Sequence, residues 1–186
     1  MQLTDIFAEG SQYREQVYAL YEEAFPEEEK KPLSLMEALT AEGKMEMLAV
    51  TEGDEFVGLA MNMLAKKTAL LDYFAIASDK RSGGYGSRAI AALLERFRDK
   101  KYIFEIEMQD ETAENALDRK RRKAFYLRNG LKETGLFANV YQTDFELLTP
   151  DGSLTFEEYV GMLNYILGDE GVRLLHPRLI RQDADC

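Results

Sequence analysis

Hydrophobic positions along the chain follow two spacings, one typical of helices and the other of strands. Tyr13, Val17 and Leu20 recur every three or four residues, which predicts an amphipathic helix that Pro26 interrupts. Short apolar runs bounded by turn residues predict strands instead. These patterns predict helices at residues 13–25, 34–43, 90–100, 113–129 and 156–167, and strands at residues 45–51, 56–64, 69–77, 102–108, 131–137 and 140–148.

Local signals mark where several of these helices begin and end. Ser34 followed by Glu37 predicts a capping box, in which each side chain accepts a hydrogen bond from the other residue's backbone N–H. Thr155 and Glu158 predict a second capping box at the start of the last helix. Gly130 follows a charged helix and predicts a left-handed cap at its end.

The order of the elements predicts the fold class. Antiparallel hairpins come first, and a strand–helix–strand–helix–strand run follows, which indicates a mixed α/β sheet with a right-handed crossover. The 186 residues are 46% hydrophobic and 31% charged, as expected for one compact domain with a real core. We expect one domain at residues 1–148, with residues 149–186 forming a C-terminal helix and tail that pack on it.

Composition and charge narrow the classes of function. The formal net charge of −11 repels a phosphate backbone, so we expect no nucleic-acid partner. The first ten residues lack a cationic segment followed by an apolar run, and no apolar stretch approaches the roughly 20 residues that cross a bilayer. We therefore expect no membrane association and a cytoplasmic protein. The single cysteine, Cys186, can form neither an internal disulfide nor a multi-cysteine zinc site.

A partial calcium motif runs from Asp151 to Glu158. These two residues fall at positions 5 and 12 of an EF-hand loop, but the first ligand position is Leu147, which cannot bind calcium. A turn followed by a helix cap explains the stretch more simply. His176, the only histidine, lies in a segment without clear periodicity, so we expect no metal site and no histidine catalysis.

A glycine-rich stretch, SDKRSGGYGSRAI at residues 78–90, links a predicted strand to a predicted helix. It is compatible with an ordinary turn, because glycine adopts positive φ at little cost. It also fits a dinucleotide fingerprint, since Gly84, Gly86 and Ala89 match G-x-G-x-x-A. Six residues separate the strand from Gly84, however, whereas that fingerprint places its first glycine at the turn itself. A third interpretation is R-x-x-G-x-G, starting at Arg81, which holds a pyrophosphate at the helix N-terminus.

Two motifs in order along the chain resemble the GNAT N-acetyltransferase superfamily. The first is the Arg81 loop, preceded by the strand LLDYFAIA and followed by a helix. The second is Phe125-Tyr-Leu-Arg-Asn-Gly130 at the end of the next helix, which is similar to the family's aromatic-Tyr-x-x-x-Gly signature. The compatible layout covers about residues 1–148. The resemblance implies a central mixed, mostly antiparallel sheet of about six to seven strands flanked by helices, with a C-terminal helix.

The same resemblance implies acetyl-CoA as the cofactor. Strand backbone near Phe74 and Ile76 is then expected to bind the pantetheine arm and the thioester oxygen. Arg119 stands where many members carry an asparagine that contacts this arm, and Arg122 stands where many carry alanine. The residues expected to hold the pyrophosphate are Arg81, Ser82, Gly83, Gly84, Tyr85, Gly86 and Ser87.

Tyr126 matches the family's general acid, which donates a proton to the leaving group. Its reference pKa near 10 keeps the phenol protonated at neutral pH. Glu105 and Glu107 lie two residues apart, so on a strand both are expected to point to one face. Either is a candidate base for the acceptor ammonium, and either is equally a candidate for a structural ion pair.

The resemblance therefore predicts an N-acetyltransferase that moves an acetyl group to a primary amine of a small molecule or a protein by direct attack. The alternatives are a non-catalytic acyl-CoA-binding module and, more distantly, a dinucleotide-dependent oxidoreductase. The resemblance also implies that the connection between the first two helices borders the acceptor cleft, and here this connection, EEAFPEEE at residues 22–29, carries five carboxylates. We therefore expect a cationic acceptor such as a polyamine, a lysine side chain or an aminoglycoside-like compound. A homodimer is compatible with the sequence.

Overall fold

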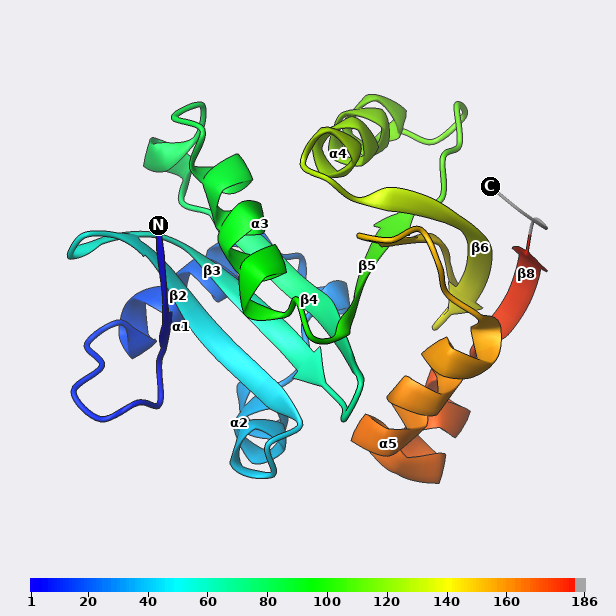
Figure 1. Ribbon diagram of the computed structural model, residues 1–186, viewed down its shortest axis with the longest axis horizontal. Coiled ribbons are helices and arrows are strands. Elements are labelled where there is room, and N and C mark those ends of the chain that lie inside the picture. Colours follow the sequence, from blue (N-terminus) through cyan, green and yellow to red (C-terminus); the bar gives the residue numbers. More distant parts are fainter. Residues whose placement is uncertain (183–186) are drawn as a thin grey trace. The chain divides into compact units, whose positions relative to one another are not determined.

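The computed structural model describes residues 1–182, and Cys186 lies outside them. The chain divides into two compact units (Figure 1). Unit 1 comprises residues 1–64 and 71–98, and unit 2 comprises residues 65–70 and the chain from Asp99 onwards. Eight strands and five α-helices in residues 1–182 confirm the mixed α/β fold class, with a C-terminal helix.

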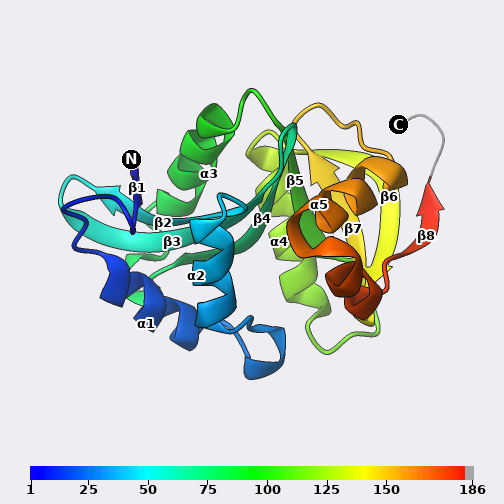
Figure 2. The ribbon, with the colours of Figure 1, turned by 90° about the horizontal axis from the view of Figure 1, so that it is seen from below.

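Unit 1 has strands in the order β1-β2-β3-β4, and β1 and β3 both pair antiparallel to β2. Helices α1 and α2 cover one face of these strands and α3 covers the other (Figure 2). Two short 3-10 turns, Glu27–Glu29 and Ser78–Lys80, precede α2 and α3. The bounds are β1 Gln2–Asp5, α1 Arg14–Ala24, α2 Leu33–Ala41, β2 Met45–Glu52, β3 Glu55–Leu64, β4 Thr68–Ile76, which begins in unit 2, and α3 Tyr85–Arg96.

The core of unit 1 consists of apolar side chains from both layers of helices. Val17 and Met36 are fully buried beneath α1 and α2, and Ile90 is fully buried beneath α3. Gly58 on β3 lies so close to β4 that a Cβ there would be 2.4 Å from the carbonyl oxygen of Ala75. Only glycine permits this approach of the two strands without a shift in the backbone.

Unit 2 has strands in the order β5-β7-β6-β8, and all three pairings are antiparallel. Helices α4 and α5 lie on opposite faces of these strands (Figure 1). Gly168 has φ +70° and interrupts α5, which ends at a left-handed His176. The bounds are β5 Lys101–Glu107, α4 Ala116–Arg128, β6 Lys132–Val140, β7 Thr143–Thr149, α5 Phe156–Leu175 and β8 Arg178–Gln182.

Of the three predicted helix caps, two are confirmed and one is wrong. The capping box of Thr155 and Glu158 is present, and Gly130 has φ +95° after α4. The box predicted at Ser34 and Glu37 does not form, because the N-cap of α2 is Pro32, two residues before Ser34. The Glu37 carboxylate instead accepts a hydrogen bond from the Tyr18 hydroxyl at 2.6 Å.

All six predicted strands are present, and β1 and β8 raise the number above the predicted six to seven. Both additional strands pair along only one edge within their unit, β1 with β2 and β8 with β6. The five residues of β8 are all exposed, so they show no alternation of buried and exposed side chains. A strand of this kind lacks the periodicity on which sequence prediction depends.

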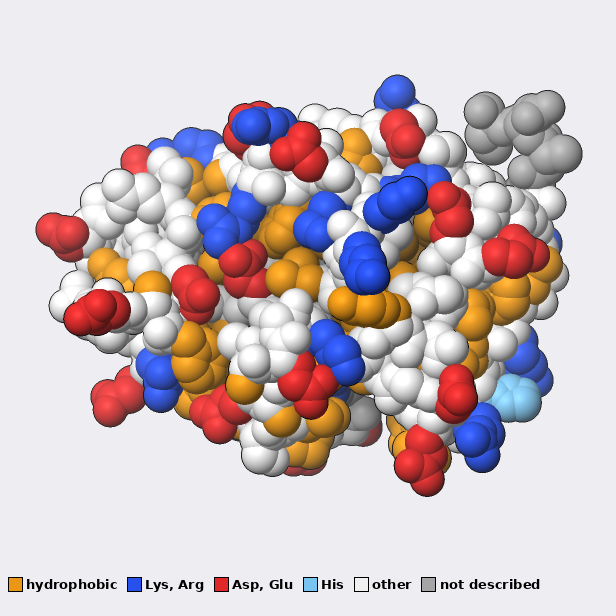
Figure 3. All heavy atoms as spheres, turned by 60° about the horizontal axis from the view of Figure 1, so that its bottom comes forward, with side chains coloured by type: hydrophobic (Ala, Val, Ile, Leu, Met, Phe, Trp, Pro, Cys, Tyr) orange, Lys and Arg blue, Asp and Glu red, His pale blue; other side chains and the backbone are white. Residues whose placement is uncertain are grey.

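The surface carries charges of both signs. Acidic and basic side chains are interspersed on the face drawn in Figure 3. Within residues 1–182, no helix combines the length and apolar character needed to span a bilayer. In the same residues, no group of three or more His, Cys, Asp or Glu side chains is arranged to hold a metal ion. Asp151 closes a turn by accepting hydrogen bonds from Thr149 and Ser153.

Candidate active site

The glycine loop of unit 1 leads directly into the N-terminus of α3. Strand β4 ends at Ile76, and the 3-10 turn Ser78–Lys80 follows before the glycines begin. Gly84 is therefore not at the end of the strand, where a dinucleotide fingerprint requires it. Ser82 has φ +71° and Gly84, the N-cap of α3, has φ +72°. Two left-handed residues thus shape the loop immediately before the helix.

This loop meets the requirements for holding a pyrophosphate. The first N–H groups of α3 have no acceptor within the helix, and the positive end of its dipole favours an anion. A Cβ on Gly83 would lie 2.8 Å from the ring of Tyr85, so this glycine is required by the loop itself. A Cβ on Gly84 would meet nothing within 4 Å, which leaves open space beside the helix N-terminus.

Two arginines flank the loop. The Arg81 Nε donates to the carbonyl oxygen of Ile76 at 3.3 Å, which holds the side chain back against the end of β4. The Arg88 guanidinium donates to Glu52 at 2.7 Å and stacks on the ring of Tyr85 at 4.7 Å. Glu52 already neutralises Arg88, whose charge is therefore less available than that of Arg81.

Strand β4 carries Phe74 and Ile76, both half-buried, and an unpredicted polar cluster precedes them. The Lys31 ammonium donates to the Asp72 carboxylate at 2.7 and 3.0 Å, and the side chain of Asp72 is 8% exposed. The Tyr73 hydroxyl donates to the carbonyl of Glu29 at 2.7 Å. These bonds tie the connection between α1 and α2 to the strand that carries Phe74 and Ile76.

Tyr21 completes this cluster. Its hydroxyl donates to the Lys31 carbonyl at 3.0 Å and accepts from the Lys31 N–H at 2.8 Å, and its ring meets that of Tyr73 edge-on. A single aspartate within the apolar run ALLDYFAIA was the sequence signal for this cluster. Its partner Lys31 lies 41 residues away, beyond the reach of local patterns.

In unit 2, Tyr126 projects from α4 onto β5. Its ring packs edge-on against Phe104, with 5.4 Å between the ring centroids. Burial raises the pKa of Tyr126 to about 12, although the nearby charge of Arg122 lowers it in part. Among the residues that the structure describes, none forms a hydrogen bond with the Tyr126 hydroxyl. The phenol therefore holds its proton at neutral pH and has a donor that the fold leaves unused.

The two candidate bases on β5 have different partners. Glu105 accepts a hydrogen bond from Tyr159 of α5. Glu107 forms ion pairs with Arg119 at 2.9 Å and with Arg122 at 3.0 Å, both on α4. Glu105 thus contacts α5 and Glu107, the last residue of β5, contacts α4. The contacts of Glu107 fit the second role considered for these carboxylates, that of a structural ion-pair partner.

Arg119 is held by several groups of unit 2. Its Nε donates to Asn115 at 2.7 Å, and its Nη1 donates to the Met108 carbonyl at 2.9 Å. With Nη2 paired to Glu107, three of its nitrogens are engaged within the unit. Phe74, Ile76 and the glycine loop thus belong to unit 1, while Tyr126, Glu105, Glu107 and Arg119 belong to unit 2.

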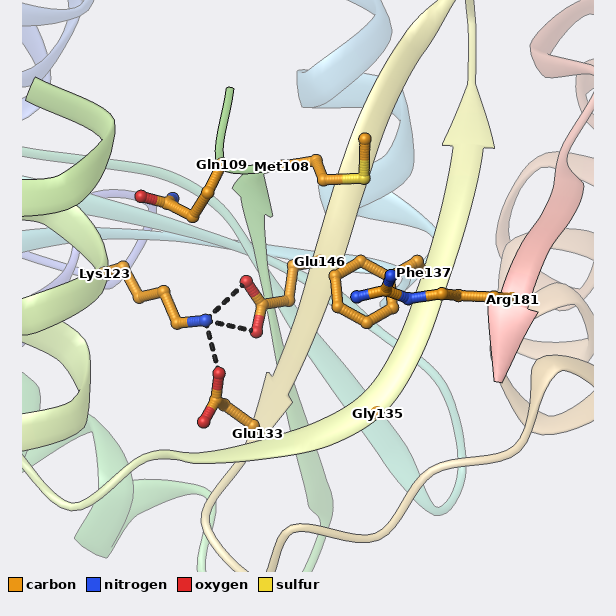
Figure 4. Close-up of a pocket in the computed structure, with 8 residues that line it drawn as sticks. All are labelled: Met108, Gln109, Lys123, Glu133, Gly135, Phe137, Glu146 and Arg181. Atoms are coloured by element: carbon orange, nitrogen blue, oxygen red, sulfur yellow. Dashed lines mark hydrogen bonds and ion pairs between the residues drawn. The ribbon is translucent and has the colours of Figure 1, made fainter. Parts of the chain in front are cut away.

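A cavity of about 340 Å³ lies beside α4 within unit 2 (Figure 4). The ammonium of Lys123 donates to both carboxylate oxygens of Glu146, at 2.8 and 2.9 Å, and also pairs with Glu133. The Arg181 guanidinium lies over the ring of Phe137, 3.9 Å from its centroid. The residues that line the cavity are Met108, Gln109, Lys123, Glu133, Gly135, Phe137, Glu146 and Arg181.

Comparison with known proteins identifies the family. The model of the acetyltransferase (GNAT) family matches residues 14–130. No curated protein sequence matches the chain. A GNAT-family protein from Bacteroides thetaiotaomicron superposes with a TM-score of 0.68 at 22% identity, covering 93% of this chain and 94% of its own.

Two aminoglycoside 6'-N-acetyltransferase structures share the fold as well. One is a complex with coenzyme A and the other is from Enterococcus faecium. Each has a TM-score of 0.60 and covers 80% of this chain and 96% of its own, at 17% and 16% identity. The family match includes both the glycine loop and the tyrosine signature, the two motifs on which the prediction of this family was based. The chain belongs to the GNAT acetyltransferase family.

Proposed function

We propose that this protein transfers an acetyl group from acetyl-CoA to a primary amine by direct attack within a ternary complex. Family membership makes the chain an N-acetyltransferase that uses acetyl-CoA. The main support for this mechanism is the state of the Tyr126 hydroxyl. It is protonated and has no hydrogen-bond partner in residues 1–182. The buried tyrosines Tyr21, Tyr73 and Tyr159, by contrast, use their hydroxyls in hydrogen bonds to the protein.

The glycine loop and α3 are the proposed binding site for the pyrophosphate of acetyl-CoA. Backbone N–H groups at the start of α3 and the Arg81 guanidinium supply the donors. Backbone near Phe74 and Ile76 is assigned to the pantetheine arm. Acetyl-CoA, when bound, supplies an activated acetyl group as a thioester. The pyrophosphate set is Arg81, Ser82, Gly83, Gly84, Tyr85, Gly86 and Ser87.

Tyr126 is the proposed general acid. Its phenolic oxygen carries the proton, and burial keeps it there throughout the neutral range. Glu105 and Glu107 remain the proposed bases for the acceptor ammonium, directly or through water. Both carboxylates also have partners in the fold, Tyr159 for Glu105 and the two arginines Arg119 and Arg122 for Glu107. Arg119 is proposed to contact the cofactor only through the face of its guanidinium that these partners leave open.

Thermal unfolding with and without ligand tests the cofactor site. At 100 times its dissociation constant, a ligand adds about 2.7 kcal/mol of stability, or roughly 5–10 °C in Tm for a protein of this size. We expect acetyl-CoA to produce this shift and NAD to produce none. A shift with NAD and none with acetyl-CoA would refute the proposed site.

The proposed acceptor is a cationic amine. The reason is the acidic connection between α1 and α2. Lys30 forms ion pairs with Glu22 and Glu27, which neutralises part of the acidic run. The 3-10 turn Glu27–Glu29 places three carboxylates next to one another, and the Tyr73 hydroxyl fastens this turn to β4 through the Glu29 carbonyl. A carboxylate surface held in one place raises the local concentration of cations.

Replacing Glu27, Glu28 and Glu29 together with glutamine tests this proposal once an acceptor is known. We expect the KM for the acceptor to rise by about threefold to tenfold at low salt, because electrostatic steering is lost. The difference should shrink as salt rises, since screening acts over about 8 Å at physiological ionic strength. The measurement is KM against salt concentration for both proteins.

A matched triple variant on α5 supplies the control. Glu157→Gln, Asp169→Asn and Glu170→Gln remove the same charge from exposed positions outside the connection. We expect the acceptor KM of this variant to equal that of the wild type. Equal KM values for the two triple variants, or a preferred acceptor that is an anion, would refute a cationic acceptor site at this connection.

A further inference from the structure

Helix α4 carries Tyr126 but has no fully buried side chain. Each residue from Ala116 to Arg128 is at least partly exposed. By contrast, α3 buries Ala89, Ile90 and Leu93 against the strands of its unit. Most helices are held in place by an apolar face. Contacts other than a fully buried apolar face therefore fasten α4 to its strands.

The contacts of α4 with the neighbouring strands and their ends include ion pairs, the hydrogen bond from Arg119 to the Met108 carbonyl and a ring contact. Arg119 and Arg122 pair with Glu107 at the end of β5, where Arg122 is half-exposed. The ring of Tyr126 meets Phe104 on β5. Lys123 reaches β7 and β6 through Glu146 and Glu133. Exposed ion pairs contribute little stability, about 0–1 kcal/mol each, whereas buried ones are strongly destabilising when broken.

The pair of Lys123 and Glu146 is the buried one. The side chain of Glu146 is 2% exposed, and both of its oxygens accept from the Lys123 ammonium. Figure 4 shows the Lys123 ammonium between the carboxylates of Glu146 and Glu133. Burial raises the pKa of Glu146, while Lys123 opposes that shift. Removing either partner would leave a desolvated charge uncompensated.

This pair lies on the same sheet face as the contact made by Tyr126. Glu146 is opposite Ile106 in the β5–β7 ladder, and Phe104 is opposite Leu148, two residues along each strand. Side chains two residues apart share a face of a strand. On α4, Lys123 precedes Tyr126 by three residues, which places the two on neighbouring positions of one helix face.

The cavity beside Lys123 makes the position of α4 depend on these bonds. About 340 Å³ of space lies next to the pair, so close-packed side chains do not fill this side of the helix. In a packed core, steric contacts on every side would hold a helix even without a particular bond. On this side of α4 the contact that the structure provides is the buried ion pair.

We propose that Lys123 and Glu146 are positioning residues, which hold α4 on the sheet so that the Tyr126 hydroxyl is directed at the reacting group. The proposal rests on the proposed function for its catalytic consequence. The docking of α4 by this pair stands independently of any activity, and it is measured separately.

The variant Glu146→Gln tests both parts. It keeps the side-chain volume and leaves Lys123 paired with Glu133 only. We expect hydrogen exchange of the α4 amides to accelerate by about tenfold while the amides of β5 and β7 are unchanged. We expect kcat to fall by about tenfold and the KM for acetyl-CoA to stay within about twofold, because a misdirected acid slows chemistry and not binding.

Two further variants serve as a control and as a substitute if Glu146→Gln does not fold. Arg121→Met removes a charge from the same helix, where Arg121 and its partner Asp118 have side chains 78% and 68% exposed, and it should change neither exchange nor kcat. Should Glu146→Gln fail to fold, the double variant Lys123→Met with Glu146→Leu replaces the pair with apolar groups of similar size. Its kcat should remain at least about fivefold below wild type, because apolar contacts specify no direction for the helix.

The outcomes separate the two claims. If α4 exchanges at the wild-type rate in Glu146→Gln, the pair does not dock the helix and the proposal is overturned. If α4 loosens and kcat is unchanged, the pair docks the helix but does not position the acid, and the proposal is again overturned. If wild-type protein transfers no acetyl group, the proposed function fails, while the exchange rates still decide whether this pair docks α4.

Discussion

Tyr126→Phe is expected to lower kcat by about 10²–10⁴-fold, the range by which a positioned general acid accelerates a reaction. The substitution keeps the ring and therefore its edge-on contact with Phe104. It removes only the hydroxyl, which forms no hydrogen bond to any residue in 1–182, so the fold loses no bond. The affinity for acetyl-CoA should change little. Steady-state kinetics, with acetyl-CoA affinity measured in parallel by thermal shift, provide the comparison.

The pH profile gives the same prediction a second readout. Because burial raises the pKa of Tyr126 to about 12, the phenol loses its proton only as pH approaches that value. Activity of the wild type should therefore rise with pH as the acceptor amine deprotonates, without a decline from Tyr126 below about pH 11. Tyr165→Phe, an exposed position on α5, is the control and should leave kcat unchanged. If Tyr126→Phe has the wild-type kcat, Tyr126 is not the general acid and its role is purely structural.

Replacing Gly84 or Gly86 with valine is expected to abolish the thermal shift with acetyl-CoA while the protein still folds. The space beside Gly84, where a Cβ meets nothing within 4 Å, is the space assigned to the pyrophosphate. A branched side chain there blocks the close approach of the ligand to the backbone N–H groups of α3. The expected loss is the whole stabilisation of about 2.7 kcal/mol at the ligand concentration given above.

Backbone strain must be separated from loss of the site, because Gly84 has φ +72°. Gly43→Val is the matched control, since Gly43 has φ +69° and likewise has nothing within 4 Å of its Cβ position. Both variants should lower the Tm of the free protein, but only the Gly84 and Gly86 variants should lose the shift. An undiminished shift in Gly86→Val would mean that the cofactor binds elsewhere.

The elements with strong periodicity could be predicted from the sequence, and those without it could not. Strands β2 to β7 are apolar runs bounded by turn residues, and each lies within two or three residues of its predicted ends. β8 is exposed along its whole length, so tertiary pairing with β6 creates it. The failed capping box at Ser34 shows the same limit, because Pro32 set the start of α2 instead.

In the candidate site, too, some features could be predicted from the sequence and others could not. The glycine loop and the tyrosine signature are contiguous motifs, and both could be identified along the chain. Lys31 with Asp72 and Lys123 with Glu146 join residues 41 and 23 positions apart. Each pair appears in the sequence only as an isolated carboxylate in an apolar strand, and nothing local indicates its partner. The partners of Glu105 and Glu107 likewise depend on which helix covers which face.

Release of free thiol from acetyl-CoA, measured across a panel of polyamines, aminoglycosides, amino acids and lysine peptides, tests the central claim most directly. The account predicts thiol release that requires both the protein and a primary amine, with one equivalent of acetylated amine for each thiol. It also predicts that Tyr126→Phe releases thiol at least about 100-fold more slowly on the same amine. Tight binding of acetyl-CoA without thiol release on any amine, or release at the same rate by Tyr126→Phe, would contradict it.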